Sequence, residues 1–204
     1  QTGWFLAEGT RICSEAAALG WEMHRLAFLA GRENDRHIRP LLAALDDAGG
    51  RALPMTGSLL QRISRKDNPQ MVLGAFAQRH IGLQDIHPDP ADIWVALDRV
   101  RDPGNLGTIL RTLAWFGGFR CLLSPGSVDP FNPKVVRASM GAIFHVPLET
   151  EVALDTLGQR YARIACLDIG GDSITKPEFQ AQDCYLFGNE ARGVPKQVLT
   201  ELGA

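Results

Sequence analysis

The chain has 204 residues, of which 45% are hydrophobic and 22% are charged, and its formal net charge at pH 7 is −2. This length supports one or two domains with buried cores, and the charge balance excludes a protein that is basic over its whole surface. No apolar run approaches the roughly 18 residues of a membrane-spanning helix, and the four cysteines include no CxxC pair. We therefore expect a globular cytoplasmic protein with reduced core thiols, no membrane partner and no bound metal.

Strands and helices alternate over residues 1–84, which predicts a small α/β sandwich. We expect strands at residues 4–7, 26–29 and 71–76, and helices at residues 10–19, 38–48 and 56–63. This half carries 10 Lys and Arg against 8 Asp and Glu, a balance of +2, whereas residues 85–204 carry 11 against 15, a balance of −4. The first half is therefore the better candidate to bind a polyanion.

A small basic loop precedes the expected strand at residues 71–76. Arg62, Arg65 and Lys66 lie there, just before the turn residues Asp67 to Gln70. They could contact RNA phosphates, although a solvated loop would show the same residues. Residues 85–91 contain two prolines and are typical of an interdomain linker, so we expect domains at 1–84 and 92–204.

The stretch that organises the second half runs from Ile93 to Gly118. Residues 93–97 form a short apolar run that is typical of a buried parallel strand, and Asp102-Pro103-Gly104 then supplies turn chemistry. Asn105 is a suitable N-cap for a helix that would end at Gly117-Gly118. The expected apolar face of that helix consists of Leu106, Ile109, Leu110, Leu113 and Phe116.

Two residues of this helix are not explained by folding alone. Gly107 would cost about 1 kcal/mol relative to Ala in a helix. Arg111 lies off the apolar face, near the carboxyl edge of the strand, which is where ligands bind in open α/β sheets. An amphipathic helix with a solvated arginine would also fit these residues.

The remaining elements again alternate. We expect strands at residues 120–123, 143–146, 162–168 and 184–187, and helices at 134–141, 152–161 and from Pro195 onward. This alternation predicts a mostly parallel sheet. Neither GxGxxG nor GxxxxGK[ST] occurs, which argues against a dinucleotide-binding Rossmann site and a P-loop enzyme.

Together, two separated patterns resemble a known family. Asn105-x-Gly107-x-x-x-Arg111 is similar to the first motif of the SpoU (TrmH-type) RNA methyltransferases of the SPOUT superfamily, and Gly188-x-Glu190-x-x-Gly193 to the second. The intervening FNPKVVRASMGAIFHVP resembles the segment between those motifs, so the likeness covers about residues 93–200. FLAEGTRICSEAA and ISRKDNPQMVLGAF resemble the L30e-like RNA-binding domain that often precedes it. The resemblance implies an L30e-like α/β sandwich followed by a SPOUT α/β-knot domain.

The family has a third motif, a stretch containing Ser-Leu-Asn, which is expected a short way beyond Leu199. The sequence reaches Ala204 before that motif. In the family this segment threads through a loop to form a deep trefoil knot, and the knot holds the adenine of the cofactor. True knots are otherwise nearly absent from proteins.

The resemblance implies transfer of a methyl group from S-adenosylmethionine to a ribose 2′-hydroxyl in rRNA or tRNA. It also implies a homodimer with the site at its interface. The sulfonium already activates the methyl carbon, so no metal is needed, and the protein has only to position and polarise the hydroxyl. A non-catalytic RNA-binding relative of the same fold is the alternative.

The resemblance assigns catalytic roles to Asn105, Arg111 and Glu190. In the family the matching arginine is proposed as the general base, but arginine is effectively always protonated. A bidentate clamp on a neighbouring phosphate is the other interpretation of Arg111. Asn105 would orient Arg111 or the ribose, and Glu190 would bind Arg111 or a cap donor.

Further residues are assigned to the two ligands. Lys134 and Arg137, one turn apart on a helix, are candidate RNA contacts from either subunit, and a solvated helix face would show them equally. The expected cofactor-binding residues are Leu167, Asp168, Gly188, Asn189 and Gly193.

Overall fold

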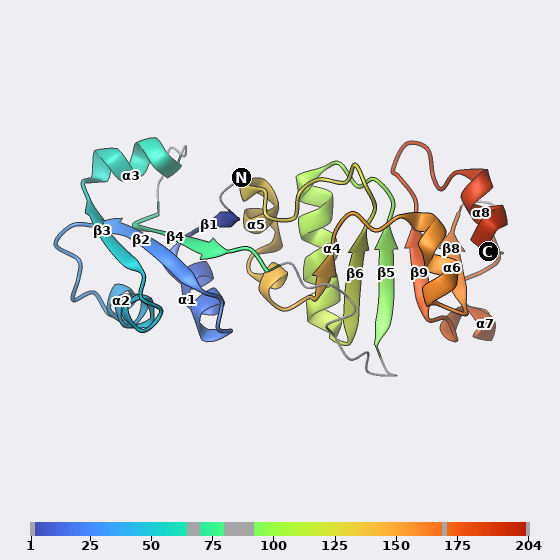
Figure 1. Ribbon diagram of the computed structural model, residues 1–204, viewed down its shortest axis with the longest axis horizontal. Coiled ribbons are helices and arrows are strands. Elements are labelled where there is room, and N and C mark those ends of the chain that lie inside the picture. Colours follow the sequence, from blue (N-terminus) through green and yellow to red (C-terminus); the bar gives the residue numbers. More distant parts are fainter. Residues whose placement is uncertain (1–2, 65–69, 80–91, 169–170, 203–204) are drawn as a thin grey trace.

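The computed structural model describes residues 3–64, 70–79, 92–168 and 171–202. Two β-sheets lie side by side along its long axis, the first within residues 4–77 and the second within residues 93–187 (Figure 1). The predicted fold class is confirmed, because both units are α/β and the second sheet is parallel. The linker expected at 85–91 lies outside the described residues, so the domain boundaries stay a prediction.

The first sheet is mixed and has helices on both faces. Its strand order is β1-β4-β2-β3, with β2 and β3 parallel and the other pairs antiparallel. Helices α1 and α2 cover one face, and α3 lies on the other, where Leu60 packs on Ala27 and Leu73 (Figure 1). The elements are β1 (Trp4–Glu8), α1 (Thr10–Ala18), β2 (Met23–Leu29), α2 (Ile38–Asp47), β3 (Arg51–Met55), α3 (Gly57–Ser64) and β4 (Val72–Ala77).

The second sheet is parallel throughout, in the order β7-β6-β5-β9-β8. Its crossovers carry helices to both faces, as parallel connections require. The elements are β5 (Ile93–Leu97), α4 (Pro103–Phe116), β6 (Phe119–Leu123), α5 (Pro133–Ser139), the 3-10 turn η2 (Ala142–Phe144), β7 (Leu148–Glu149), η3 (Leu154–Thr156), α6 (Leu157–Arg160), β8 (Ile164–Leu167), α7 (Pro177–Gln180), β9 (Cys184–Phe187) and α8 (Lys196–Leu202).

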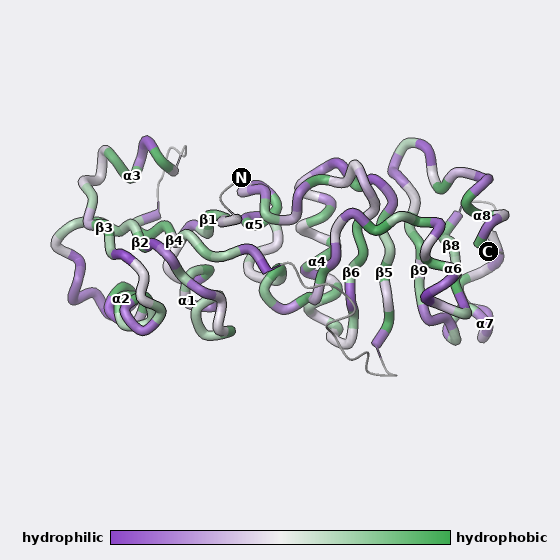
Figure 2. The backbone as a smooth tube through the Cα atoms, viewed as in Figure 1, coloured by the Kyte–Doolittle hydropathy of each residue, from purple (hydrophilic) through white to green (hydrophobic). Residues whose placement is uncertain are grey.

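Strand β5 shows why this sequence forms a sheet that is covered on both faces. Successive side chains of a strand point to opposite faces. Val95 and Leu97 accordingly pack with residues of α4 and α5, whereas Trp94 and Ala96 pack with residues of α6 and α8. Hydrophobic residues concentrate in these inner strands, and the loop after β9 is mostly hydrophilic (Figure 2).

The two units share one hydrophobic core. The ring centroid of Phe5 in β1 lies 5.0 Å from that of Phe131, in the loop before α5, and the Trp21 and Phe144 centroids are 5.3 Å apart. A hydrogen bond of 2.8 Å joins His145 Nε2 and Glu15 Oε1 across the same junction. Aromatic burial of this kind couples the units far more strongly than a flexible tether would.

Several local predictions were wrong. The strand expected at residues 143–146 is absent: η2 spans Ala142–Phe144 and a bend follows, because Met140 and Gly141 adopt positive φ and the apolar residues that follow fill the junction core. The helix expected over residues 152–161 is reduced to η3 and α6. Strands β3 and β7 and helix α7 were not predicted. None of the described helices is long and apolar enough to cross a membrane.

Candidate active site

Helix α4 begins earlier than predicted, and Asn105 is not its cap. Asp102 is the N-cap: its Oδ1 accepts a 2.8 Å hydrogen bond from Asn105 N, and Pro103 occupies the first helical position. The Asn105 side chain is therefore released from capping. Its Nδ2 donates a 3.0 Å hydrogen bond to Glu190 Oε1, across 85 positions of sequence.

Glu190 is held from two sides. Asn189 Nδ2 donates to Glu190 Oε2 at 3.3 Å and to the carbonyl of Arg99 at 2.9 Å. The loop after β9 is thereby tied both to α4 and to the loop after β5. Each of these segments follows the carboxyl end of a parallel strand, which is where such sheets bind ligands.

The loop after β9 depends on its two motif glycines. Gly193 has φ +64°, and its N and O exchange hydrogen bonds with Asn189 at 2.9 and 3.2 Å. A Cβ on Gly188 would lie 2.3 Å from Gly193 C and 2.5 Å from Val194 N. The turn role expected for Gly193 fits this geometry. The close approach of Gly188 to the Gly193–Val194 backbone also requires a residue without a Cβ, and its contact with the cofactor stays a prediction.

A cleft with a volume of about 730 Å³ lies between these segments. Asp98, Asp102 and Glu190 contribute carboxylates to its walls, while Arg99, Arg101 and Arg192 contribute guanidinium groups. Mixed charge of this kind can accept a ligand that carries both a cationic and an anionic group, and S-adenosylmethionine is such a molecule, with a sulfonium and an amino-acid carboxylate. Asn105, Asn189 and Gly193 also line the cleft.

Arg111 is not among the residues that line this cleft. It lies on the exposed face of α4, and it makes no hydrogen bond or ion pair with the residues that the structure describes. Six residues advance a helix by about 600°, so Arg111 projects about 120° away from Asn105. Within one chain the structure therefore joins Asn105 to Glu190, and it leaves Arg111 on another face of the same helix.

Leu167 and Asp168 line a separate cavity of about 700 Å³ between β8 and α7. Leu167 pairs in register with Phe187, so this cavity and the cleft flank neighbouring strand ends. Cys166 also lines the cavity, and burial raises the pKa of its thiol to about 11. The thiol is therefore protonated at neutral pH and is no nucleophile.

The expected RNA contacts are scattered. Arg62 is exposed near the end of α3, and Arg65 and Lys66 lie outside the described residues. Lys134 and Arg137 are exposed on α5, which Asn132 caps through a 2.9 Å hydrogen bond to Lys134 N. Among the residues described, no group of three or more His, Cys, Asp or Glu is placed to hold a metal ion.

Several site residues were missed from the sequence. Asp102 could have been recognised, since Asp directly before Pro is a typical N-cap and first-position pair. Asp98 is only 2% exposed, and it accepts a 2.8 Å hydrogen bond from Ser124 Oγ. Ser124 in turn accepts one from Arg99 N at 2.8 Å. No sequence pattern predicts this hydrogen-bond network of Asp98, Arg99 and Ser124, because its members follow two different strands.

Comparison with known proteins gives the class of this chain. Residues 92–203 match the SpoU rRNA Methylase family, and residues 1–74 match the MRM3-like substrate binding domain. The crystal structure of an AdoMet-bound rRNA methyltransferase from Sinorhizobium meliloti is 35% identical, with a TM-score of 0.88 over 100% of this chain and 77% of that one.

Two curated relatives extend the match over both units. An uncharacterized tRNA/rRNA methyltransferase of Synechocystis sp. is 29% identical over 98% of this chain and 73% of its own length. The 23S rRNA (uridine(2479)-2′-O)-methyltransferase of Streptomyces viridochromogenes is 27% identical over 95% of this chain and 70% of its own.

The fold and the cleft thus define a SPOUT-type methyltransferase domain behind a substrate-binding domain. The chain belongs to the SpoU rRNA methylase family, whose members methylate RNA with S-adenosylmethionine. The resemblance carried by the two sequence motifs is confirmed.

Proposed function

We propose that this protein methylates a ribose 2′-hydroxyl in rRNA or tRNA. The observation that carries the proposal is the hydrogen bond between Asn105 and Glu190, which unites the two motifs at the carboxyl edge of the sheet. The name of the Streptomyces viridochromogenes relative, a 2′-O-methyltransferase, supports the choice of the ribose hydroxyl. A cytoplasmic location belongs to the same proposal, supported by four cysteines that are all unpaired.

S-adenosylmethionine, when bound, supplies a methyl carbon already activated by the sulfonium. The reaction forms an O–C bond to the ribose, breaks the S–C bond and releases the hydroxyl proton. Asn189 and Gly193 of the cleft would hold the cofactor beside Gly188, with Leu167 and Asp168 at the neighbouring strand end. Glu190, fixed by two amide donors, keeps its carboxylate in one position, and such positioning can supply several kcal/mol.

We assign Arg111 to a phosphate clamp at the cleft of a second copy of the chain. Arg111 faces away from the cleft of its own chain, and arginine is well shaped to bind a phosphate with two parallel hydrogen bonds. Two aromatic side chains stand on the same helix and are unusually exposed, Trp115 at 86% and Phe116 at 72%. We propose a homodimer that buries them and places Arg111 at the cleft of its partner. The same dimer would present Lys134 and Arg137 to RNA, with Arg62, Arg65 and Lys66 as contacts in the first unit.

Mixing two variants tests the shared site. Arg111→Ala and Glu190→Gln should each lower methyl transfer to RNA by about 100-fold or more while leaving the fold intact. Unfolded and refolded together in equal amounts, they should recover about one quarter of wild-type activity, since half of the dimers are mixed and each holds one intact site.

The outcomes are distinct. No recovery on mixing would place Arg111 and Glu190 in the same chain's site and refute the shared arrangement. Unchanged turnover of Arg111→Ala would remove Arg111 from the reaction. Methyl groups mapped to a base rather than to a ribose would refute the 2′-O assignment. A folded wild type that binds RNA without binding S-adenosylmethionine would favour the non-catalytic relative.

A further inference from the structure

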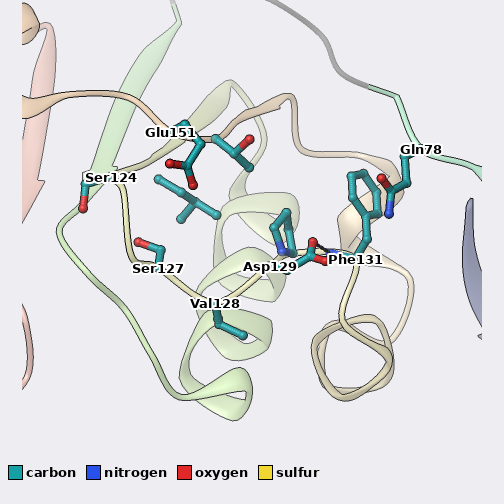
Figure 3. A pocket seen from close by; sticks show the side chains of 10 residues that line it. Gln78, Ser124, Ser127, Val128, Asp129, Phe131 and Glu151 are labelled. Carbon is teal, nitrogen blue, oxygen red and sulfur yellow. Dashed lines mark hydrogen bonds between the residues drawn. The ribbon is translucent and has the colours of Figure 1, made fainter. Parts of the chain in front are cut away.

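A third hollow, of about 230 Å³, lies where the two units meet (Figure 3). Its walls come from the loop after β6, from the end of β7 and from Gln78 just after β4. Glu151 and Ser127 stand on one side, and Asp129, Phe131 and Gln78 stand on the other (Figure 3). The hollow is smaller than the roughly 300 Å³ at the lower end of sites for drug-sized ligands, so it suits a group the size of a nucleobase.

Two features of this junction pocket are costly to the folded chain. The Ser127 Oγ is buried and makes no hydrogen bond within the described structure, which costs about 1–3 kcal/mol. Glu151 adopts φ +59°, a left-handed conformation that is uncommon for non-glycine residues and often occurs at functional sites. Both residues line the hollow.

The junction pocket shares a wall with the active-site cleft. Ser124 lines the pocket. Its hydroxyl donates a hydrogen bond to Asp98 Oδ1 and accepts one from Arg99 N, each at 2.8 Å. Asp98 and Arg99 line the cleft, and the Arg99 carbonyl accepts from Asn189. A ligand in the pocket is therefore separated from the cleft by one hydrogen-bonded layer.

The lining selects against phosphate and in favour of N–H donors. Glu151 and Asp129 bring two carboxylates, and one oxygen of Asp129 already accepts from Phe131 N at 2.8 Å. These anionic groups repel a phosphate but accept hydrogen bonds from ring N–H and amino groups. Pro130 and Phe131 add apolar surface against which a flat ring can lie.

We propose that the junction pocket holds the base of the nucleotide being methylated. The Glu151 carboxylate would accept hydrogen bonds from the N–H groups of the base, and the Ser127 hydroxyl would make a further hydrogen bond with it. Enzymes that modify RNA commonly extrude the target nucleotide and recognise the Watson–Crick edge of its base. Guanine presents two adjacent N–H groups at that edge and satisfies both carboxylate oxygens, whereas uracil presents one. This assignment rests on the proposed RNA methylation, because only that activity makes the bound base a methylation target. Binding of a nucleoside to the pocket can nevertheless be measured without methyl transfer.

The test is a titration of the protein with guanosine and with uridine, followed by the amide resonances of Gln78, Ser127 and Val128. Guanosine should shift these resonances more strongly than uridine. Glu151→Gln should weaken guanosine binding about tenfold, because an amide nitrogen replaces one charged acceptor. Asp155→Asn, an exposed acid four positions away and outside the pocket, should bind as the wild type does.

Ser127→Ala adds a signature that a purely structural residue would not give. Removing a buried hydroxyl without a partner should raise the melting temperature, while guanosine binding falls. Absence of nucleoside shifts in the pocket, or equal binding by Glu151→Gln and wild type, would overturn the assignment. The proposed function is judged separately: a wild type that transfers no methyl to RNA fails there, while the nucleoside shifts still decide the pocket.

Discussion

The substitution Gly107→Ala changes stability through two opposing effects, helix propensity and steric overlap. Alanine is favoured over glycine within a helix by about 1 kcal/mol, so propensity alone predicts that the variant is stabilised. The structure predicts the opposite. An added Cβ would lie 2.4 Å from Ala138 Cβ and 2.8 Å from both Ala138 C and Ser139 N, because α4 and α5 meet closely at this point.

The magnitude follows from what can move. Two of the three clashing atoms are backbone, so relief requires α5 to shift as a whole, and overpacking a core in this way costs about 1–3 kcal/mol. Taking the upper end and subtracting the gain in propensity leaves about 2 kcal/mol of destabilisation. For a chain of this size, that lowers the melting temperature by roughly 4–8 °C.

Thermal unfolding of Gly107→Ala, compared with Thr108→Ala, measures this effect. Thr108 is the next residue of α4 and is exposed, so its replacement tests helix propensity without the clash. In a double-mutant cycle, Gly107→Ala should destabilise an Ala138→Gly background less than it destabilises the wild type, because Ala138→Gly removes the nearest of the three contacts. A Gly107→Ala protein that melts at or above the wild-type temperature would refute the reasoning.

Two further predictions concern the last strand, β9, and its flanks. Gly188→Ala would place a Cβ 2.3 Å from Gly193 C, so it should displace the loop after β9. Calorimetry should then show S-adenosylmethionine binding weakened by at least about tenfold. The control Gly158→Ala, whose Cβ meets nothing closer than 3.5 Å, should bind the cofactor as the wild type does. The 2.6 Å hydrogen bond from Arg163 lowers the pKa of Asp183 below its usual value, so this carboxylate stabilises the fold above about pH 5 and loses that effect as the pH falls through its folded pKa. The melting-temperature difference between wild type and Asp183→Asn should therefore be full at neutral pH and shrink in acid; a difference independent of pH would contradict this.

Strands β5 and β9 were predicted with their observed bounds, because each is a short apolar run bounded by charge or glycine. Strand β3 was missed for the opposite reason. It lies at the edge of the first sheet, mostly exposed, and contains Pro54, so no hydrophobic pattern marks it. The strand predicted at residues 143–146 was wrong because burial at a junction between units and burial in a sheet select the same residue types.

The candidate active site was likewise predicted only in part. The motif spacing predicted Asn105 and Glu190 as site residues, and the structure joins them by a hydrogen bond, but the spacing could not show that Asp102 takes over the capping role. The motif also assigned Arg111 to the site; within one chain, helix geometry turns that residue to another face, and its catalytic role stays a prediction. A linear pattern records which residues a family requires, whereas the face on which each one acts depends on the packing of α4.

The aromatic contacts between Phe5, Trp21, Phe131 and Phe144 hold the two units at a fixed spacing. Because these rings pack against one another in one core, the spacing between the first unit and the cleft of the second is fixed. If the first unit anchors RNA as proposed, we expect the distance between that anchor and the target nucleotide to act together with base recognition in selecting the nucleotide. Lengthening the RNA between anchor and target would then move the methyl mark, even where the local sequence is unchanged.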